Sequence, residues 1–439
     1  MEEIRPSVCE AQVRRSLRLY VACLGALWAV ALLVLWIQPN MFGRAYPYDT
    51  LLFNPNDRFT DFTIFYPRLV TYGRPEEFFS PSWYPFTYPA PLLLCYLVIG
   101  RFVEWPLAAY LGLVCIFACS TALVAIRRLP RGRSLRRFAS VALISATVFS
   151  FPLLYLLDRA NVEGLVWIAA AAGLYCFAKR YYYSTAVFLA LATSMKLFPG
   201  VLLLLLLAKR RYREFAASVV FTAAFTVASL WAIGPSIPRA NSSVAMGLDF
   251  FKRLQILRIH PSEIGFDHSL FSSVKLVAFG FMPDVARVNA ALPEIYVAYG
   301  VGVVILFAAI YFLRLRKMPV LNQVLALSAL SVTLPYTSYE YTLVHLAVPF
   351  IFVVYFLTGD VAPGFAPLEM RQILALVLPF FIIFGPTSFL FHLPIVQDPR
   401  EDIGFGGQVK TMALIYLIAV ALRLRLPSTL FEELGTRTT

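Results

Sequence analysis

Long apolar runs separated by short polar segments make up almost the whole of this 439-residue chain. Many of the runs are long enough to cross the ~30 Å hydrocarbon core of a bilayer at a helical rise of ~1.5 Å per residue. The pattern therefore predicts an all-α polytopic membrane protein with about twelve transmembrane helices. We expect them at residues 19–37, 105–126, 140–157, 162–178, two short arms within 184–208, 215–233, 290–313, 320–336, 342–357, 373–390 and 409–422.

Two other apolar runs are predicted to lie along the membrane surface. The run at 89–103 is short, begins with Pro89 and is interrupted by Arg101, so it suits a surface better than a crossing. The run at 269–281 is the second such juxtamembrane helix.

The run at 184–208 has basic residues on both sides, so it must turn back within the membrane. Pro199 and Gly200 break the helix, and Lys196 lies near the apex of the turn. Each arm is only ~16 Å long at helical rise, so the apex stops inside the membrane unless a water-filled cavity meets it. A lysine at this position could bind a phosphate or could extend to the lipid headgroups.

Basic clusters between the apolar runs orient the helices. Arg14, Arg15 and Arg18 precede the first run, and the segment Arg127 to Arg137 is the most basic part of the chain. By the positive-inside rule both clusters are cytoplasmic, which places Asp61 outside and both termini in the cytoplasm.

Composition supports the same class. Hydrophobic residues make up 59% and charged residues 14% of the chain, against roughly 25% charged residues in soluble domains. The net charge of +13 arises from the scattered clusters, so nucleic acid is not an expected partner, whereas membrane lipids are. No segment between the runs is long enough for a soluble domain, and residues 1–439 form one integral-membrane domain.

Asp61 is the strongest candidate for chemistry. It lies in D-F-T-I-F-Y-P-R-L-V-T-Y-G, directly after the first predicted crossing. A carboxylate at the membrane surface can remove a proton from an acceptor hydroxyl of a lipid-linked substrate. Asp57, four residues earlier, could equally be a helix cap or a solvated loop residue.

Aromatic and basic residues surround Asp61 in the predicted external segments. The rings could stack on sugars or form an interfacial belt, and the cations could hold an anionic group. Asp158 and Arg159 could instead pair with each other. The aromatic candidates are Tyr66, Trp83, Tyr84 and Tyr88, and the basic candidates are Arg68, Arg159, Lys196 and Lys275.

Two later motifs contain histidine beside acid. In P-Y-T-S-Y-E-Y-T-L-V-H, Glu340 and His345 could form a proton relay or contact a sugar, although such a pair is more often structural. In G-F-D-H-S-L, Asp267 could cap a helix and leave His268 exposed. No metal-ligand spacing, Walker loop or dinucleotide fingerprint occurs, so neither a metal nor a cofactor is predicted.

Taken in order, these motifs resemble the GT-C superfamily of polyprenyl-phosphate-dependent glycosyltransferases, and within it the mannosyltransferase-like glycosyltransferase family 87. The resemblance extends over roughly residues 19–357. Its motifs are D-F-T-I-F-Y-x-x-L-V-x-Y-G from Asp61, Y-P-F-T-Y-P-A-P from Tyr84, R-A-N-V-E from Arg159, S-M-K-L-F-P-G from Ser194 and H-S-L-F from His268. The chain departs from relatives at R-A-N, where G-Q-x-N is frequent, and at Tyr339 to Tyr341, where tryptophan and histidine are frequent.

The resemblance implies an inverting transferase of the cell membrane that moves a sugar, such as mannose or another hexose or pentose, on the extracytoplasmic face. The donor would be a polyprenyl-phosphate sugar and the acceptor a lipid-linked or glycan hydroxyl. Residues 17–233 would form the catalytic module, with its first external loop at 38–104, and residues 234–439 the further helices. The implied roles are Asp61 as general base; Lys196, Arg159 and Arg68 at the donor phosphate; Tyr66, Trp83, Tyr84, Tyr88, His268, Glu340 and His345 at the sugar or acceptor; and Asp57 and Asp158 as secondary acids.

Two other functions remain open from the sequence. A lipid-linked-sugar transporter or flippase would also place charges in a membrane, but transporters often show an internal repeat, and none stands out here. A non-catalytic membrane assembly protein would tolerate the loss of Asp61.

Overall fold

The computed structural model describes residues 8–44, 47–48, 50, 54, 58–65, 86–102, 104–130, 133–260, 263–282, 284–359, 368–395 and 398–431. The candidates Asp57, Tyr66, Arg68, Trp83 and Tyr84 lie outside these residues.

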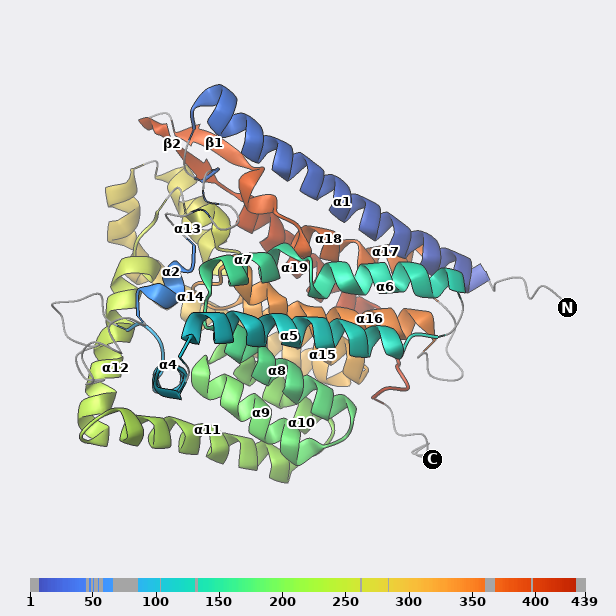
Figure 1. The fold of residues 1–439 in the computed structure, drawn as a ribbon, viewed down its shortest axis with the longest axis horizontal. Coiled ribbons are helices and arrows are strands. Elements are labelled where there is room, and N and C mark those ends of the chain that lie inside the picture. The colour runs from blue at the N-terminus through green and yellow to red at the C-terminus, as the bar shows by residue number, and fades with distance from the viewer. Residues whose placement is uncertain are drawn as a thin grey trace, which may run out of the picture.

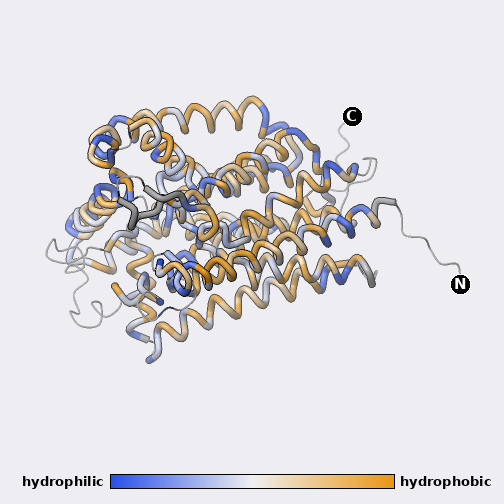
Figure 2. Tube along the Cα trace, turned by 90° about the horizontal axis from the view of Figure 1, so that it is seen from above, coloured by the Kyte–Doolittle hydropathy of each residue, from blue (hydrophilic) through white to orange (hydrophobic). Residues whose placement is uncertain are grey.

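Most of the described chain forms a bundle of helices that run roughly side by side, with an apolar middle and polar ends (Figures 1 and 2). Six helical segments of the described chain are long and apolar enough to cross a membrane, which confirms the prediction of a multi-pass membrane protein. They are Glu10–Phe42, Pro106–Arg127, Leu135–Arg159, Tyr212–Ile233, Val285–Lys317 and Glu340–Thr358. Six shorter apolar helices accompany them, and the predicted number of twelve crossings stays a prediction.

Two helices form the buried centre of the bundle. In α15 (Val320–Thr333) every residue from Leu321 onward is buried, including Asn322 and Gln323, and α16 (Ala347–Thr358) is almost as enclosed. Helix α16 is apolar nearly all round, as expected for a helix in such a core. By contrast, α14 (Val285–Leu313) exposes Val301, Val304 and Ile305, as expected for a helix that faces lipid.

Around this core the chain order is α1 (Val8–Phe42), α4 (Ala90–Phe102), α5 (Pro106–Arg127), α6 (Arg133–Thr147), α7 (Phe151–Arg159), α8 (Glu163–Ala178), α9 (Tyr182–Met195), α10 (Leu204–Ala208), α11 (Tyr212–Ile233), α13 (Leu270–Phe281), α17 (Met370–Val377), α18 (Pro379–Phe384) and α19 (Gly406–Arg423). Helices α2, α4, α12 and α13 gather at one end of the bundle, which we call the site end, away from both termini (Figure 1).

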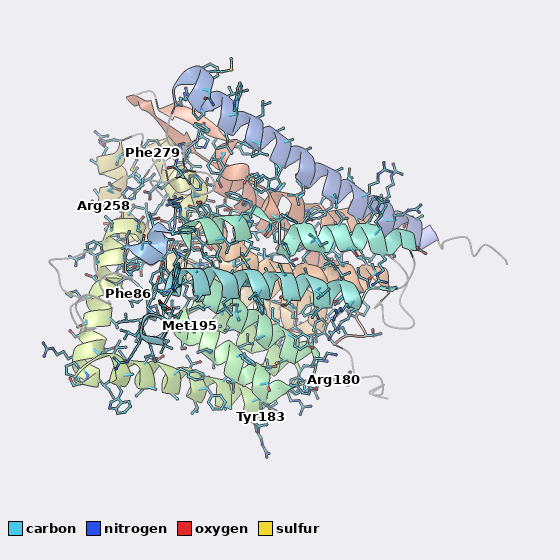
Figure 3. All side chains as sticks on the ribbon, viewed as in Figure 1. Phe86, Arg180, Tyr183, Met195, Arg258 and Phe279 are labelled. Atoms are coloured by element: carbon cyan, nitrogen blue, oxygen red, sulfur yellow. The ribbon has the colours of Figure 1, made fainter. Side chains whose placement is uncertain are left out.

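The run at 184–208 is broken where the sequence predicted. Helix α9 ends at Met195, Lys196 has an extended backbone, and η2 (Phe198–Leu203) begins with Pro199 in its first turn. Pro199 has no backbone N–H to extend α9, and in the first turn of η2 that N–H is not needed. Figure 3 shows α9 rising from Tyr183 near the opposite end toward Met195 in the interior of the bundle.

Three local features add detail to the expectations from the sequence. The predicted crossing at 140–157 lies within the candidate span Leu135–Arg159, inside which Ser150 caps a new helix, α7, with its side chain accepting from the Leu153 N–H. The segment 234–269 contains α12 (Ile237–Phe251). Before α19, the chain forms an antiparallel pair of strands, β1 (His392–Ile395) and β2 (Asp398–Gly404), the sole sheet among the described residues.

Candidate functional site

Asp61 lies on α2 (Thr60–Thr63), a single helical turn at the site end. The backbone N–H of Phe59 donates to the carbonyl oxygen of Asp158 at 2.6 Å, which ties α2 to the end of α7. Tyr96 of α4 donates to the carbonyl oxygen of Asp61 at 3.1 Å. Helix α7 itself ends at Ala160, whose φ of 48° is left-handed and turns the chain sharply into α8. The end of α7 and the Tyr96 hydroxyl of α4 therefore hold α2, and with it Asp61, in position.

Asn161 joins Asp61 to the start of α8. Its Nδ2 donates to Oδ2 of Asp61 at 2.6 Å and to the hydroxyl of Tyr88 at 3.2 Å, while its Oδ1 accepts from the backbone N–H of Glu163 at 2.9 Å. Because the amide oxygen is occupied by that N–H, the NH₂ group must face Asp61. The amide can only donate to Asp61, so it favours the ionised carboxylate and restricts its rotation.

Lys196 is paired with a buried acid, Glu163. Its Nζ lies 2.5 Å from Oε2 of Glu163, and Nε2 of His345 lies 2.6 Å from Oε1 of the same carboxylate. The Glu163 side chain is 0% exposed and that of Lys196 17% exposed. The ammonium also lies over the rings of Tyr88 and Tyr341, at 5.2 and 5.6 Å from their centroids.

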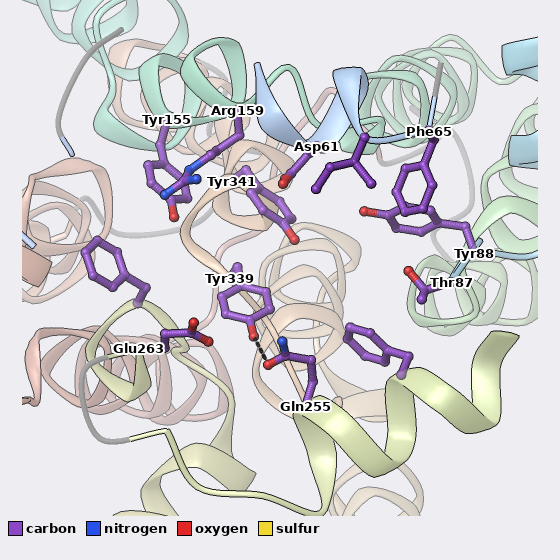
Figure 4. Close-up of a pocket in the computed structure, with 13 residues that line it drawn as sticks. Asp61, Phe65, Thr87, Tyr88, Tyr155, Arg159, Gln255, Glu263, Tyr339 and Tyr341 are labelled. Carbon is purple, nitrogen blue, oxygen red and sulfur yellow. Dashed lines mark hydrogen bonds between the residues drawn. The ribbon is translucent and has the colours of Figure 1, made fainter. Parts of the chain in front are cut away.

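A polar cavity of about 210 Å³ opens beside Asp61 (Figure 4). Arg159 lines it together with Asp61; its Nη1 donates to Thr60 at 3.2 Å and its guanidinium lies over the Tyr155 ring. The other lining residues are Ile64, Phe65, Thr87, Tyr88, Tyr155, Phe251, Gln255, Glu263, Phe266, Tyr339 and Tyr341. The structure thus brings a carboxylate and a cation from separate segments to one cavity.

The remaining candidates lie around this cavity and are not among its lining residues. Asp158 is buried at the end of α7. His268 is buried and hydrogen-bonded with the Ser338 and Thr342 hydroxyls at 3.1 and 3.2 Å, so it is not the exposed residue that the sequence suggested. Glu340 is buried against Lys410 of α19 and Ser388. A direct sugar contact by His268 or Glu340 stays a prediction.

Asp267 and His268 belong to a buried polar frame beside the site. Burial raises the pKa of Asp267 above its ordinary value and lowers the pKa of His268 well below its own. The Asp267 carboxylate accepts from the backbone N–H groups of Ser269 and Ser338 at 2.8 and 2.9 Å. These bonds fasten the start of α13 to the segment before η6 (Glu340–Leu346). The N-cap of α13 is Ser269, whose side chain accepts from the Ser272 N–H, so the helix cap lies two residues after the predicted Asp267.

Several residues of the site were not assigned a role from the sequence. Asn161 and Glu163 belong to the R-A-N-V-E motif quoted above. Two polar residues directly before an apolar helix were the sequence signal that could have identified them. Gln255, Glu263 and Tyr341 gave no comparable signal, because they line the cavity only through the packing of distant segments.

A helical membrane bundle with a carboxylate and a guanidinium in one polar cavity at its end is the arrangement of an enzyme that acts at a membrane. The profile of glycosyltransferase family 87 matches residues 86–344, more than half of the chain. The chain belongs to glycosyltransferase family 87 and is a membrane glycosyltransferase. No curated protein and no solved structure matches it. The matched range includes Arg159, Lys196 and His268, begins after Asp61 and ends one residue before His345.

Proposed function

We propose that the protein transfers a sugar, such as mannose or another hexose or pentose, from a polyprenyl phosphate to a hydroxyl of a lipid-linked or glycan acceptor. The observation that carries this proposal is the shared cavity of Asp61 and Arg159, one hydrogen-bonded residue away from the Lys196–Glu163 pair. We place this chemistry on the extracytoplasmic face of the cell membrane, because the basic clusters at the other end of the helices favour a cytoplasmic location there.

The reaction needs one base. The acceptor hydroxyl attacks the anomeric carbon, the bond from that carbon to the phosphate oxygen breaks, and the configuration inverts. Asp61 accepts the hydroxyl proton as the new bond forms. The departing phosphate monoester is a good leaving group without protonation, so no general acid is required.

The charge that accumulates on the leaving phosphate needs cations. Arg159 lines the cavity and presents a planar fork that suits phosphate oxygens. Lys196 lies next to the same wall through its contacts with Tyr88 and Tyr341. We therefore assign donor binding to both, with Arg159 contacting the phosphate and Lys196 adding positive charge behind the aromatic rings.

Asn161→Asp tests whether the Asn161 amide holds Asp61 ionised. The variant keeps an oxygen that can accept from the Glu163 N–H, but it places a second carboxylate next to Asp61. Two carboxylates in contact repel each other when both are ionised, so the pair keeps one shared proton up to a higher pH. The acidic limb of the kcat profile should therefore move up by about one pH unit or more, measured as sugar transfer between pH 5 and 9. Asn289→Asp is the matched control, because its oxygen accepts the Ile259 N–H and Asn289 is not among the residues that line the cavity. Equal profiles for Asn161→Asp and wild type would contradict this role.

Lys196→Ala should raise the KM for polyprenyl-phosphate mannose by about tenfold and lower turnover, since loss of the positive charge behind the aromatic rings weakens the attraction of the anionic donor. Lys196→Arg should recover part of the loss. The exposed Lys179→Ala serves as control. Radiolabel transfer at varied donor concentration measures both constants, and an unchanged KM for Lys196→Ala would exclude Lys196 from the donor site.

A further inference from the structure

The cavity has a second polar wall that the transfer chemistry above does not use. Gln255 lies in η3 (Lys252–Ile256), Glu263 directly precedes η4 (Ile264–Phe266), and Tyr339 directly precedes η6. Figure 4 shows Gln255 and Glu263 on the side of the cavity away from Asp61 and Arg159. We call Gln255, Glu263 and Tyr339 the acceptor wall.

The amide of Gln255 has a defined orientation. The Tyr339 hydroxyl donates to Oε1 of Gln255 at 3.2 Å, so the NH₂ group is left to donate into the cavity. The segment behind it is held by Lys275, whose Nζ donates to the carbonyl oxygens of Gln255 and Arg258 at 2.8 Å each. The wall therefore presents a fixed hydrogen-bond donor.

Glu263 supplies the complementary acceptor. Its side chain is partly exposed and lines the cavity. Among the residues that the structure describes, its carboxylate has no hydrogen-bond or ion-pair partner, although Lys275 interacts with it electrostatically. An ionised carboxylate can accept hydrogen bonds from two neighbouring hydroxyl groups.

We propose that the acceptor wall binds the non-reacting hydroxyl groups of an uncharged sugar at the end of the acceptor, and that Glu263 rejects acceptors with an anionic group at that sugar. This inference rests on the proposed function, because it assumes that the reacting hydroxyl faces Asp61. When the reacting hydroxyl faces Asp61, the other hydroxyl groups of the acceptor sugar face Glu263 and the Gln255 amide.

Aromatic rings complete a surface suited to a sugar. Tyr155 is stacked between Phe266 and Tyr341, with ring centroids 5.9 and 6.1 Å apart, and all three line the cavity. A flat apolar ring can cover the C–H face of a sugar while polar groups fix its hydroxyls, a combination typical of small-ligand sites.

Charge decides between neutral and anionic acceptors. Of the described lining residues, Asp61 and Glu263 are acidic and Arg159 is basic, and the donor phosphate already requires Arg159. Arg258 and Lys275 line a separate space of about 20 Å³ beside Glu263, which holds little more than a water molecule. Among the described lining residues, a second anion would therefore meet Glu263 without a cation of its own, and like charges in contact strongly disfavour binding.

The test compares two probes that differ only in charge, octyl α-mannoside and its 6-phosphate. Their affinities are measured by equilibrium binding to the protein carrying Asp61→Asn, with and without Glu263→Gln. The neutral probe should bind at least about tenfold more tightly when Glu263 is present. Glu263→Gln should reduce this ratio by about tenfold, because the phosphorylated probe gains affinity. Glu263→Asp should keep the preference, and the exposed Glu294→Gln is the matched control.

The inference would be overturned if the ratio of the two probe affinities were the same with Glu263 and with Glu263→Gln. It would also be overturned if the phosphorylated probe bound more tightly than the neutral probe in the presence of Glu263. Transfer from polyprenyl-phosphate mannose to octyl α-mannoside is measured in parallel with the wild-type protein. Failure of transfer would remove mannose from the sugars that the proposed function allows, whereas the binding ratio in the Asp61→Asn background still decides whether Glu263 selects the acceptor.

Discussion

The Asp61→Asn variant is expected to lose sugar transfer by about 10²–10⁴-fold or more, because a positioned general base contributes about that much to a rate. Asn has nearly the shape of Asp and can still meet the Asn161 side chain, so the fold and the donor site should survive. The assay is transfer of radiolabelled mannose from polyprenyl-phosphate mannose in detergent or proteoliposomes. Thermal unfolding and direct donor binding, measured on the same preparation, should match the wild type.

Asp249→Asn is the matched control, because Asp249 is an exposed acid on α12 whose pair with Arg253 at 2.8 Å lies on the protein surface. Its transfer rate should equal that of the wild type. Retained transfer in Asp61→Asn would remove Asp61 from the role of base. It would also favour the alternatives of a transporter or an assembly protein, for which this carboxylate is dispensable.

The second large effect concerns stability. Glu340 and Lys410 form an ion pair in which both side chains are 0% exposed, and Ser388 bonds to the same carboxylate. Lys410→Met leaves the Glu340 charge buried without its partner, which should reduce the free energy of unfolding by about 3–5 kcal/mol. Unfolding in mixed micelles by added SDS measures this change. Lys317→Met, at an exposed lysine, should have little effect.

The double variant Glu340→Gln with Lys410→Met separates the ion pair from the packing around it. Removing both charges avoids the buried unpaired charge, so the double variant should be more stable than Lys410→Met alone. Additive losses would mean that the two side chains do not interact in the folded protein. A sugar-binding role for Glu340 would instead appear as a changed acceptor KM with unchanged stability.

Much of the fold could be read from local patterns. The length and hydropathy of the runs identified a helical membrane protein, and the M-K-L-F-P-G turn located the break at Lys196, with Pro199 in the first turn of η2. Proline by itself does not predict a break, since Pro39 and Pro293 lie inside the continuous helices α1 and α14. The same reasoning missed the break before α7, where Pro152 and the Ser150 cap start a new helix. Because the residues on both sides of that break are apolar, the hydropathy pattern did not reveal it.

The candidate site was predictable only in part. Asp61 and Arg159 were found because each lies in a polar motif next to an apolar run, and both line the cavity. The partner of Lys196 was missed: Glu163 is 33 residues away, and it is joined to His345 across 182 residues. Such contacts follow from helix packing and leave no periodic signal in the chain.

By itself the sequence determined that the chain must lie in a membrane, since no soluble fold could bury so many long apolar runs, and it located the helix break at Lys196. Only the tertiary structure decided which polar groups meet. In the apolar bundle each buried charge needs a partner close by. Helix packing pairs Lys196 with Glu163 and Lys410 with Glu340, and it places Asp61 and Glu263 at the cavity.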